Sequence, residues 1–234
     1  MLETEFFVFN SFGENTYVIY NPQDAHAIIV DPGCLITDEK NELETFVRDH
    51  QLTVEAILLT HGHFDHVLGL KFCFDLYGAP VYMHPADKAV QAENEKNSRL
   101  FGLIFKDSQV PTQDICDGQV LDLIGRKWTV ITTPGHTPGS VCYHCPEEGI
   151  LLTGDTLFRG TIGRTDLPMG DYDREIVSIM DKIMGLDGAT KILPGHGPDS
   201  TISDERTHNP FLEPFNEPEQ DGLDWDADGI EIHG

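Results

Sequence analysis

Short apolar stretches with a two-residue alternation open the chain and predict β-strands. Their β-branched and aromatic residues favour extended backbone, and the segments GEN and NPQD between them have the composition of turns. A later apolar run, EAILLT, is typical of a buried strand. The strands predicted in this half of the chain are residues 5–10, 15–20, 25–31, 55–60 and 80–84.

Apolar positions at helical spacing lie between these strands. Leu43, Phe46 and Val47 share one face of a predicted helix, and Pro85 opens another at a position where proline is tolerated. The helices predicted in this half are residues 38–50, 66–77 and 85–98.

The second half follows the same order of elements. Two sheets packed face to face, with helices outside them, would bury the apolar faces of all these elements. The pattern therefore predicts an α/β fold, a four-layer αββα sandwich, in one domain over residues 1–212. The elements predicted here are strands near 119–123, 127–132, 140–145, 149–153 and 190–193, with a helix at 172–184.

Residues 98–113 are apolar but follow no clean period. Two interpretations of this segment are open: a satellite cluster of the core, or a lid over a substrate pocket. Its large apolar side chains are Leu100, Phe101, Leu103, Ile104 and Phe105.

Acidic residues outnumber basic ones by 40 to 15, which gives a net charge of −25 at pH 7. Residues 213–234 hold eight of these acids and no Lys or Arg, so this segment is predicted to be a solvated acidic tail. Without it the chain still carries −17, because 32 acidic residues oppose 15 basic ones. Duplex binding depends on neutralised phosphates, so neither nucleic acid nor an anionic membrane is an expected partner.

The N-terminal segment MLETEFFVFN has acids where a secretory signal would carry positive charge, and no apolar run approaches the ~20 residues that cross a bilayer. Five cysteines are spread without the pattern of a disulfide framework. Cys142 and Cys145 form a CxxC, but the alternating stretch around them is typical of a strand. We expect a cytoplasmic protein.

A cluster of metal-binding residue types follows the strand predicted at 55–60. The segment THGHFDH contains His61, His63, Asp65 and His66. In extended backbone, side chains two residues apart point the same way, so His61 and His63 can bind one ion while Asp65 and His66 face another. Without a metal, this crowding of three histidines and a carboxylate would cost desolvation energy. The cluster therefore predicts a metal centre.

Three more candidate ligands follow the same rule of placement. His136, Asp155 and His196 each lie in a loop directly after an apolar strand. Glycines beside each of them allow the backbone to turn tightly and to approach an ion. The predicted ligands, five histidines and two aspartates, thus come from one edge of the sandwich.

The motif HxHxDH followed by a later His, Asp and His resembles the metallo-β-lactamase superfamily, over residues 5–210. The resemblance implies the four-layer αββα metallo-β-lactamase sandwich and a supporting role for Asp31 in IIVDPG. It implies two metal sites and a bridging carboxylate: a first site at His61, His63 and His136, a second at Asp65, His66 and His196, and the bridge at Asp155.

Two divalent metal ions are therefore expected. Histidine and aspartate ligands without cysteine favour Zn²⁺, and Fe or Mn use the same ligand types. Two cations that share a bridging water lower its pKa from ~15.7 toward neutrality and supply hydroxide as the nucleophile. Asp65 is expected to ligate and to help orient that hydroxide, while a metal polarises the substrate carbonyl.

Residues 154–171 and 193–211 are similar to the glyoxalase II-like hydrolases, which cleave thioesters such as acylated glutathione. The likeness is nearest to the shorter, single-domain members. Glyoxalase II carries a C-terminal helical domain for the glutathione portion, whereas 38 residues follow His196 here. The resemblance implies a binuclear hydrolase of a small acyl thioester or ester, and it makes no prediction of the acyl group, the thiol carrier or the oligomeric state.

Arg164 in the segment GRTD has two interpretations. Its planar fork can bind a substrate carboxylate, or it can form an internal ion pair with Asp166 that shapes the loop. The second interpretation, the internal ion pair, is favoured.

Other activities remain open on this scaffold. A persulfide dioxygenase, which uses a single iron, resembles the chain in both HxHxDH and GRTD. Lactone, ester or β-lactam hydrolysis is open because a bridging hydroxide attacks many acyl groups. A redox or non-catalytic member would use the metal centre as a scaffold, and the complete ligand set disfavours that class.

Overall fold

The structure, a computed structural model, describes residues 1–103, 105 and 110–215. Its strands form two six-stranded sheets and a two-stranded hairpin. The first sheet has the order β1-β2-β3-β4-β5-β6. Strands β1 to β3 are antiparallel neighbours, and β3 to β6 are parallel ones. The bounds are β1 Glu3–Phe9, β2 Glu14–Asn21, β3 His26–Val30, β4 Thr53–Leu58, β5 Val81–Met83 and β6 Thr112–Asp114.

The second sheet has the order β14-β13-β10-β9-β8-β7, in which only β10 and β13 are parallel neighbours among the described strands. Its bounds are β7 Val120–Leu123, β8 Arg126–Thr132, β9 Val141–Cys145, β10 Ile150–Gly154, β13 Lys191–Pro194 and β14 Ser200–Thr201. The hairpin consists of β11 Leu157–Phe158 and β12 Thr161–Ile162.

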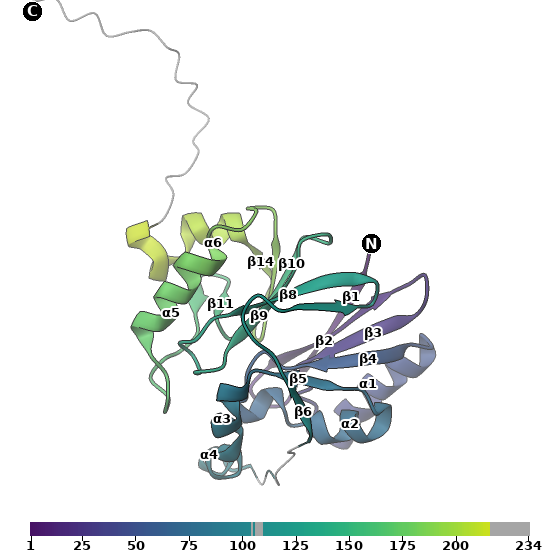
Figure 1. Cartoon of the computed structure of the whole chain (residues 1–234). Coiled ribbons are helices and arrows are strands. Elements are labelled where there is room, and N and C mark those ends of the chain that lie inside the picture. The colour runs from purple at the N-terminus through teal and green to yellow at the C-terminus, as the bar shows by residue number, and fades with distance from the viewer. Residues whose placement is uncertain (104, 106–109, 216–234) are drawn as a thin grey trace, which may run out of the picture.

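Helices cover the outer face of each sheet (Figure 1). The α-helices are α1 Thr37–Asp49, α2 Leu70–Tyr77, α3 Lys88–Ala92, α4 Asn94–Leu100, α5 Tyr172–Ser178 and α6 Ile202–His208. Short 3₁₀-helices are η1 Phe64–His66, η2 Pro85–Asp87 and η4 Pro210–Phe215, and η3 Ile179–Ile183 is a π-helical turn.

Three hydrophobic clusters lie between the layers. Successive strand residues point to opposite faces, so one strand contributes side chains to two of these clusters. Ile28 packs between the sheets near Trp128, whereas Ile29 packs with Leu43 of α1. A third cluster joins the second sheet to α5, η3 and α6. Burying each large aliphatic side chain stabilises the fold by roughly 1.5–3 kcal/mol. The predicted αββα sandwich is confirmed.

The helix predicted at 85–98 is broken into η2, α3 and α4. Two of the buried polar side chains of this segment bond to one distant residue: Asp87 accepts a hydrogen bond from Gly62 N, and Asn94 Nδ2 donates one to Gly62 O. Both side chains thus tie this segment to the loop that carries His61 and His63.

Each of the two interpretations of residues 98–113 fits a different part of this segment. Leu100 and Phe101 are exposed and line a cavity. Leu103, Phe105 and Val110 instead pack on the cluster beneath the first sheet. Ile104 and residues 106–109 lie outside the described residues, as does the predicted acidic tail from residue 216 onward.

Cys142 and Cys145 are both buried residues of β9, and each is a free thiol. Cys142 packs in the outer cluster and Cys145 in the cluster between the sheets. The CxxC is therefore part of a strand, as its alternation predicts. Within the described ranges, no helix combines the length and the apolar composition that crossing a membrane requires.

Candidate metal centre

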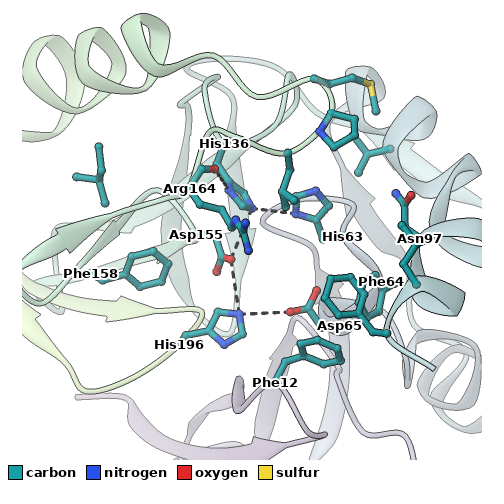
Figure 2. A pocket seen from close by; sticks show the side chains of 17 residues that line it. Phe12, His63, Phe64, Asp65, Asn97, His136, Asp155, Phe158, Arg164 and His196 are labelled. Atoms are coloured by element: carbon teal, nitrogen blue, oxygen red, sulfur yellow. Dashed lines mark hydrogen bonds and ion pairs between the residues drawn. The ribbon is translucent and has the colours of Figure 1, made fainter. Parts of the chain in front are cut away.

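The seven predicted ligands meet at one edge of the two sheets. Strand β4 ends shortly before His61, β8 before His136, β10 at the residue before Asp155, and β13 two residues before His196. Since β3, β4 and β5 run parallel, as do β10 and β13, the loops that follow these strands gather at the same edge. Figure 2 shows side chains from these loops pointing toward one another.

His61, His63 and His136 form the first group, with ligand atoms within 4.8 Å of one another. The Nδ1 atom of His63 lies 2.9 Å from Nε2 of His136. Burial, together with the neighbouring histidines, lowers the pKa of His61 well below its usual value and that of His63 to about 3. These rings are neutral at physiological pH, so their nitrogen lone pairs are free to bind a cation.

Asp65, His66 and His196 form the second group under the same distance limit. Nε2 of His196 lies 3.2 Å from Nε2 of His66 and 3.4 Å from Oδ2 of Asp65. Burial opposes ionisation of Asp65, but the charge of His66 and the contact with His196 together lower its pKa. The carboxylate is therefore ionised and suited to a hard or borderline cation.

Asp155 lies between the two groups. Its Oδ1 is 3.3 Å from His66 Nε2, and its Oδ2 is 3.5 Å from His136 Nε2 and 3.6 Å from His196 Nε2. Burial would raise the pKa of this carboxyl, yet the neighbouring histidines, His66 first, hold it well below its usual value. One ionised side chain thus faces both groups.

Two buried ligand atoms have no hydrogen-bond partner among the described residues: His61 Nε2 and Asp155 Oδ1. An unpaired buried polar atom costs about 1–3 kcal/mol, so a native site normally supplies a partner. Both atoms are metal-ligand types and lie inside the cluster. The residues present therefore fit a metal centre.

Hydrogen bonds fix the ring orientation of the histidines. Nδ1 of His136 lies 2.7 Å from Arg164 O, and Nδ1 of His196 lies 3.2 Å from Gly13 O. Because a carbonyl oxygen only accepts, each Nδ1 donates to it, and Nε2 is the ring nitrogen directed at the centre.

Asp31 lies beneath the second group. Its carboxylate accepts hydrogen bonds from Thr60 N at 2.7 Å and from Thr60 Oγ1 at 2.5 Å, and its Oδ2 lies 3.1 Å from His66 Nδ1. These contacts occupy both oxygens. Although Asp31 also lies within metal-binding distance of His61 and His66, its position is that of a support for the His66 ring.

Two buried acidic residues, which the hydrophobic pattern did not single out, also contact the site. Asp87 accepts from Gly62 N, Gly139 N and Thr137 Oγ1, which ties the first histidine loop to the loop that carries His136. Glu175 on α5 accepts from His136 N, and burial raises its pKa to about 8. Asp87 follows the apolar strand β5 closely, as the predicted ligands follow theirs, so the placement rule contained a signal for it.

A cavity of about 440 Å³ opens above the cluster, and His63, Asp65, His136, Asp155 and His196 form its floor. Arg164 also lines it, and its Nε and terminal nitrogen donate to Asp166 Oδ1 and Oδ2 at 2.8 and 2.9 Å. The interpretation of Arg164 as one half of an internal ion pair therefore holds in this structure.

Comparison with known proteins places these features in a family. The model of the metallo-beta-lactamase superfamily matches residues 10–196. Hydroxyacylglutathione hydrolase GloC of Haemophilus influenzae is 34% identical over 204 residues, which cover 86% of this chain and 94% of that protein. Probable metallo-hydrolase YqgX of Bacillus subtilis is 34% identical over 197 residues, with 82% and 93% covered.

Several solved structures are similar to this chain in fold, and some of them are similar in sequence as well. The B3 metallo-beta-lactamase BLEG-1 has a TM-score of 0.83 at 38% identity and covers 90% of this chain and 99% of its own. TTHA1623 in a di-iron-bound form has a TM-score of 0.80 at 33% identity, with 89% and 100% covered. ETHE1 from Myxococcus xanthus, at 22% identity, a TM-score of 0.71 and 94% and 92% covered, shows the fold alone.

Proposed function

Because the chain belongs to the metallo-β-lactamase superfamily, we propose that it is a binuclear metal-dependent hydrolase that cleaves small acyl thioesters. The position of Asp155 carries this proposal. Its two carboxylate oxygens lie 3.3 Å from His66 Nε2 and 3.5 Å from His136 Nε2, so one side chain faces both ligand groups. Two-metal hydrolases need such a shared ligand to keep their ions a few ångströms apart.

Zinc is the metal that we propose for both groups, with iron or manganese as alternatives. The ligands are nitrogen and carboxylate oxygen, which suit all three metals, and the relative TTHA1623 is described in a di-iron-bound form. When bound, two such cations would supply Lewis acidity, which lowers the pKa of water at the site and polarises the scissile carbonyl. His61, His63 and His136 would hold one ion, Asp65, His66 and His196 the other, and Asp155 both.

Asp65 has a second proposed role, because it is both a member of the second group and part of the cavity floor. Its ionised carboxylate can accept a hydrogen bond from the attacking water and orient the water oxygen toward the acyl carbon. A carbon–oxygen bond then forms and the carbon–sulfur bond breaks. The departing sulfur takes up the proton, which gives a carboxylic acid and a thiol.

The thioester assignment is supported by the likeness to a protein described as a hydroxyacylglutathione hydrolase. The net charge of −25 and the small cavity support a small-molecule substrate over nucleic acid or a membrane. The cysteines are free in the described part of the chain, which supports a reducing, cytoplasmic location.

β-Lactam hydrolysis is the second candidate. It is favoured by one observation, the 38% identity and near-complete overlap with a protein described as a B3 metallo-beta-lactamase. The attack on a strained amide carbonyl would use the same floor residues as the attack on a thioester.

Metal content and turnover measured on the same sample test the proposal. Protein purified without added metal is analysed for its elements and then assayed on acyl thioesters, on a chromogenic cephalosporin and on a persulfide with oxygen monitored. About two zinc per chain, with thioester cleavage lost in His61→Ala and kept in the control His50→Ala at an exposed helix end, supports it. About one iron per chain with oxygen consumed on the persulfide, or cleavage of the cephalosporin alone, overturns it.

A further inference from the structure

The cavity above the metal centre has an aromatic wall. The ring centroid of Phe12 lies 5.1 Å from that of Phe64 and 5.3 Å from that of Phe101, with near-perpendicular planes. Phe64 and Phe101 lie 5.7 Å apart. The three rings come from the β1–β2 turn, η1 and the end of α4, so tertiary packing assembles a single apolar surface. Figure 2 shows two of them, Phe12 and Phe64, beside Asp65.

The opposite wall is apolar as well. Phe158 on β11 lies across the metal centre from Phe12 and Phe64 in Figure 2, with its ring centroid 6.4 Å from that of His196. Ile162 on β12, Leu167 and Met169 also line the cavity. A group that enters between the walls therefore exchanges water for hydrocarbon on both sides.

Some of these side chains are exposed to water at the rim. Leu100 is 78% exposed, Phe101 54% and Met169 43%. They come from two separate segments, α4 with its end and the loop after β12, yet they line the same cavity. Apolar surface gathered around a concave site is typical of a ligand site, because an apolar ligand removes that surface from water.

The cavity offers little to a charged carrier. Among its described lining residues, Arg164 is the one Lys or Arg, and both carboxylate oxygens of Asp166 already accept hydrogen bonds from it. The net charge of −25 also repels anions from the molecule as a whole. A thiol carrier with several carboxylates or phosphates would therefore find no free counter-charge at this entrance.

We infer that the substrate is a thioester with an apolar acyl group on an uncharged carrier, and that the acyl chain lies between the wall of Phe12, Phe64 and Phe101 and the wall of Phe158. This inference rests on the proposed thioester hydrolysis. The volume of about 440 Å³ corresponds to roughly 15 volumes of liquid water at ~30 Å³ each, which admits a six-carbon acyl chain with part of its carrier.

Two measurements on the metal-loaded, full-length protein test the inference. The first is the kcat/KM of N-acetylcysteamine thioesters from acetyl to hexanoyl, compared with lactoylglutathione. Each methylene that leaves water should raise kcat/KM about fourfold, so hexanoyl, with four more methylenes than acetyl, should exceed acetyl by roughly 250-fold and also exceed lactoylglutathione. The second is calorimetric binding of the uncleavable S-methyl and S-hexyl thioethers of N-acetylcysteamine, where the hexyl compound has five more methylenes and should bind roughly 1,000-fold more tightly.

A matched pair of variants assigns the effect to the aromatic wall. Phe101→Ala should reduce the hexanoyl-to-acetyl ratio of kcat/KM roughly fivefold to tenfold. Phe6 is equally exposed at 54% but lies on β1 and does not line the cavity, so Phe6→Ala should leave the ratio unchanged. Both side chains are half exposed, so loss of folding should not obscure the comparison.

The outcomes separate this inference from the proposed function. Thioester cleavage without chain-length preference, or with preference for lactoylglutathione, overturns the apolar-acyl inference and leaves the hydrolase standing. Tight binding of the hexyl thioether by a protein that cleaves no thioester keeps the apolar site and overturns the proposed reaction. Equal loss of the ratio in Phe101→Ala and Phe6→Ala overturns the assignment to this wall.

Discussion

Replacement of Asp87 by alanine should loosen the first metal group without touching a ligand. The carboxylate is fully buried and joins two loops: Oδ2 accepts from Gly62 N at 2.7 Å, and Oδ1 accepts from Gly139 N at 2.6 Å. Gly62 lies between His61 and His63, and Gly139 follows His136 by three residues. Asp87 therefore sets the distance between the loops that supply this group.

The expected loss of stability follows from the hydrogen-bond donors that would no longer have an acceptor. Two backbone N–H groups lose their acceptor, at ~1–3 kcal/mol each, whereas Thr137 Oγ1 keeps Ser140 Oγ at 2.7 Å. The expected loss is therefore about 4 kcal/mol, which lowers Tm by roughly 8–16 °C in a domain of this size. Asp87 contacts the loops that carry the ligands and not the metal itself. Loss of such a supporting contact weakens metal binding about 10- to 100-fold, so the zinc affinity of the first group should fall by that factor.

Thermal melts of the metal-free protein and competition for zinc with a chromophoric chelator measure the two effects. Asp87→Asn keeps one acceptor oxygen and should lose about half as much stability. Asp114→Ala, which breaks an exposed ion pair with Lys88, is the control and should cost at most ~1 kcal/mol. If Asp87→Ala melts within about 2 °C of the wild type and binds zinc normally, the tie between the loops has no such role.

Three further predictions follow. In Gly195→Ala, the new Cβ would lie 2.3 Å from Asp155 Oδ1, so the zinc stoichiometry should fall. In the control Gly185→Ala, the new Cβ has no neighbour within 4 Å, so the stoichiometry should stay the same. Equal stoichiometries in the two variants would refute the steric argument. A double-mutant cycle of Arg164 and Asp166 should give ~0.2–1 kcal/mol of coupling, because both are exposed, and unchanged KM for neutral thioesters, measured by denaturation and kinetics. Chelation should lower Tm reversibly, since zinc at 1,000 times its Kd stabilises by about 4 kcal/mol per site; an unchanged Tm would contradict metal binding in the native state.

The local pattern of apolar and polar residues was sufficient to predict the layers of the fold. Two-residue alternation places Ile28 and Ile29 on opposite faces of β3 whatever the rest of the chain does, and helical spacing directs Leu43 inward. The longer irregular segments were less predictable. In the segment 85–100, Asp87 accepts a hydrogen bond from a distant loop and Asn94 donates one to it, and no local pattern contains those contacts.

What the sequence by itself determined is the set of layers and the residue types after each apolar strand, because side-chain periodicity and strand-end loops are local properties. It also indicated which seven side chains could meet, since parallel neighbours deliver their loops to one edge. The structure has Asp155 between the two groups, as the family resemblance implied, and only the tertiary structure decided that Asp87 and Glu175 support them. Only it brought Phe12, Phe64 and Phe101 into one wall, because these contacts join segments far apart in the chain, and packing density rather than sequence spacing sets them.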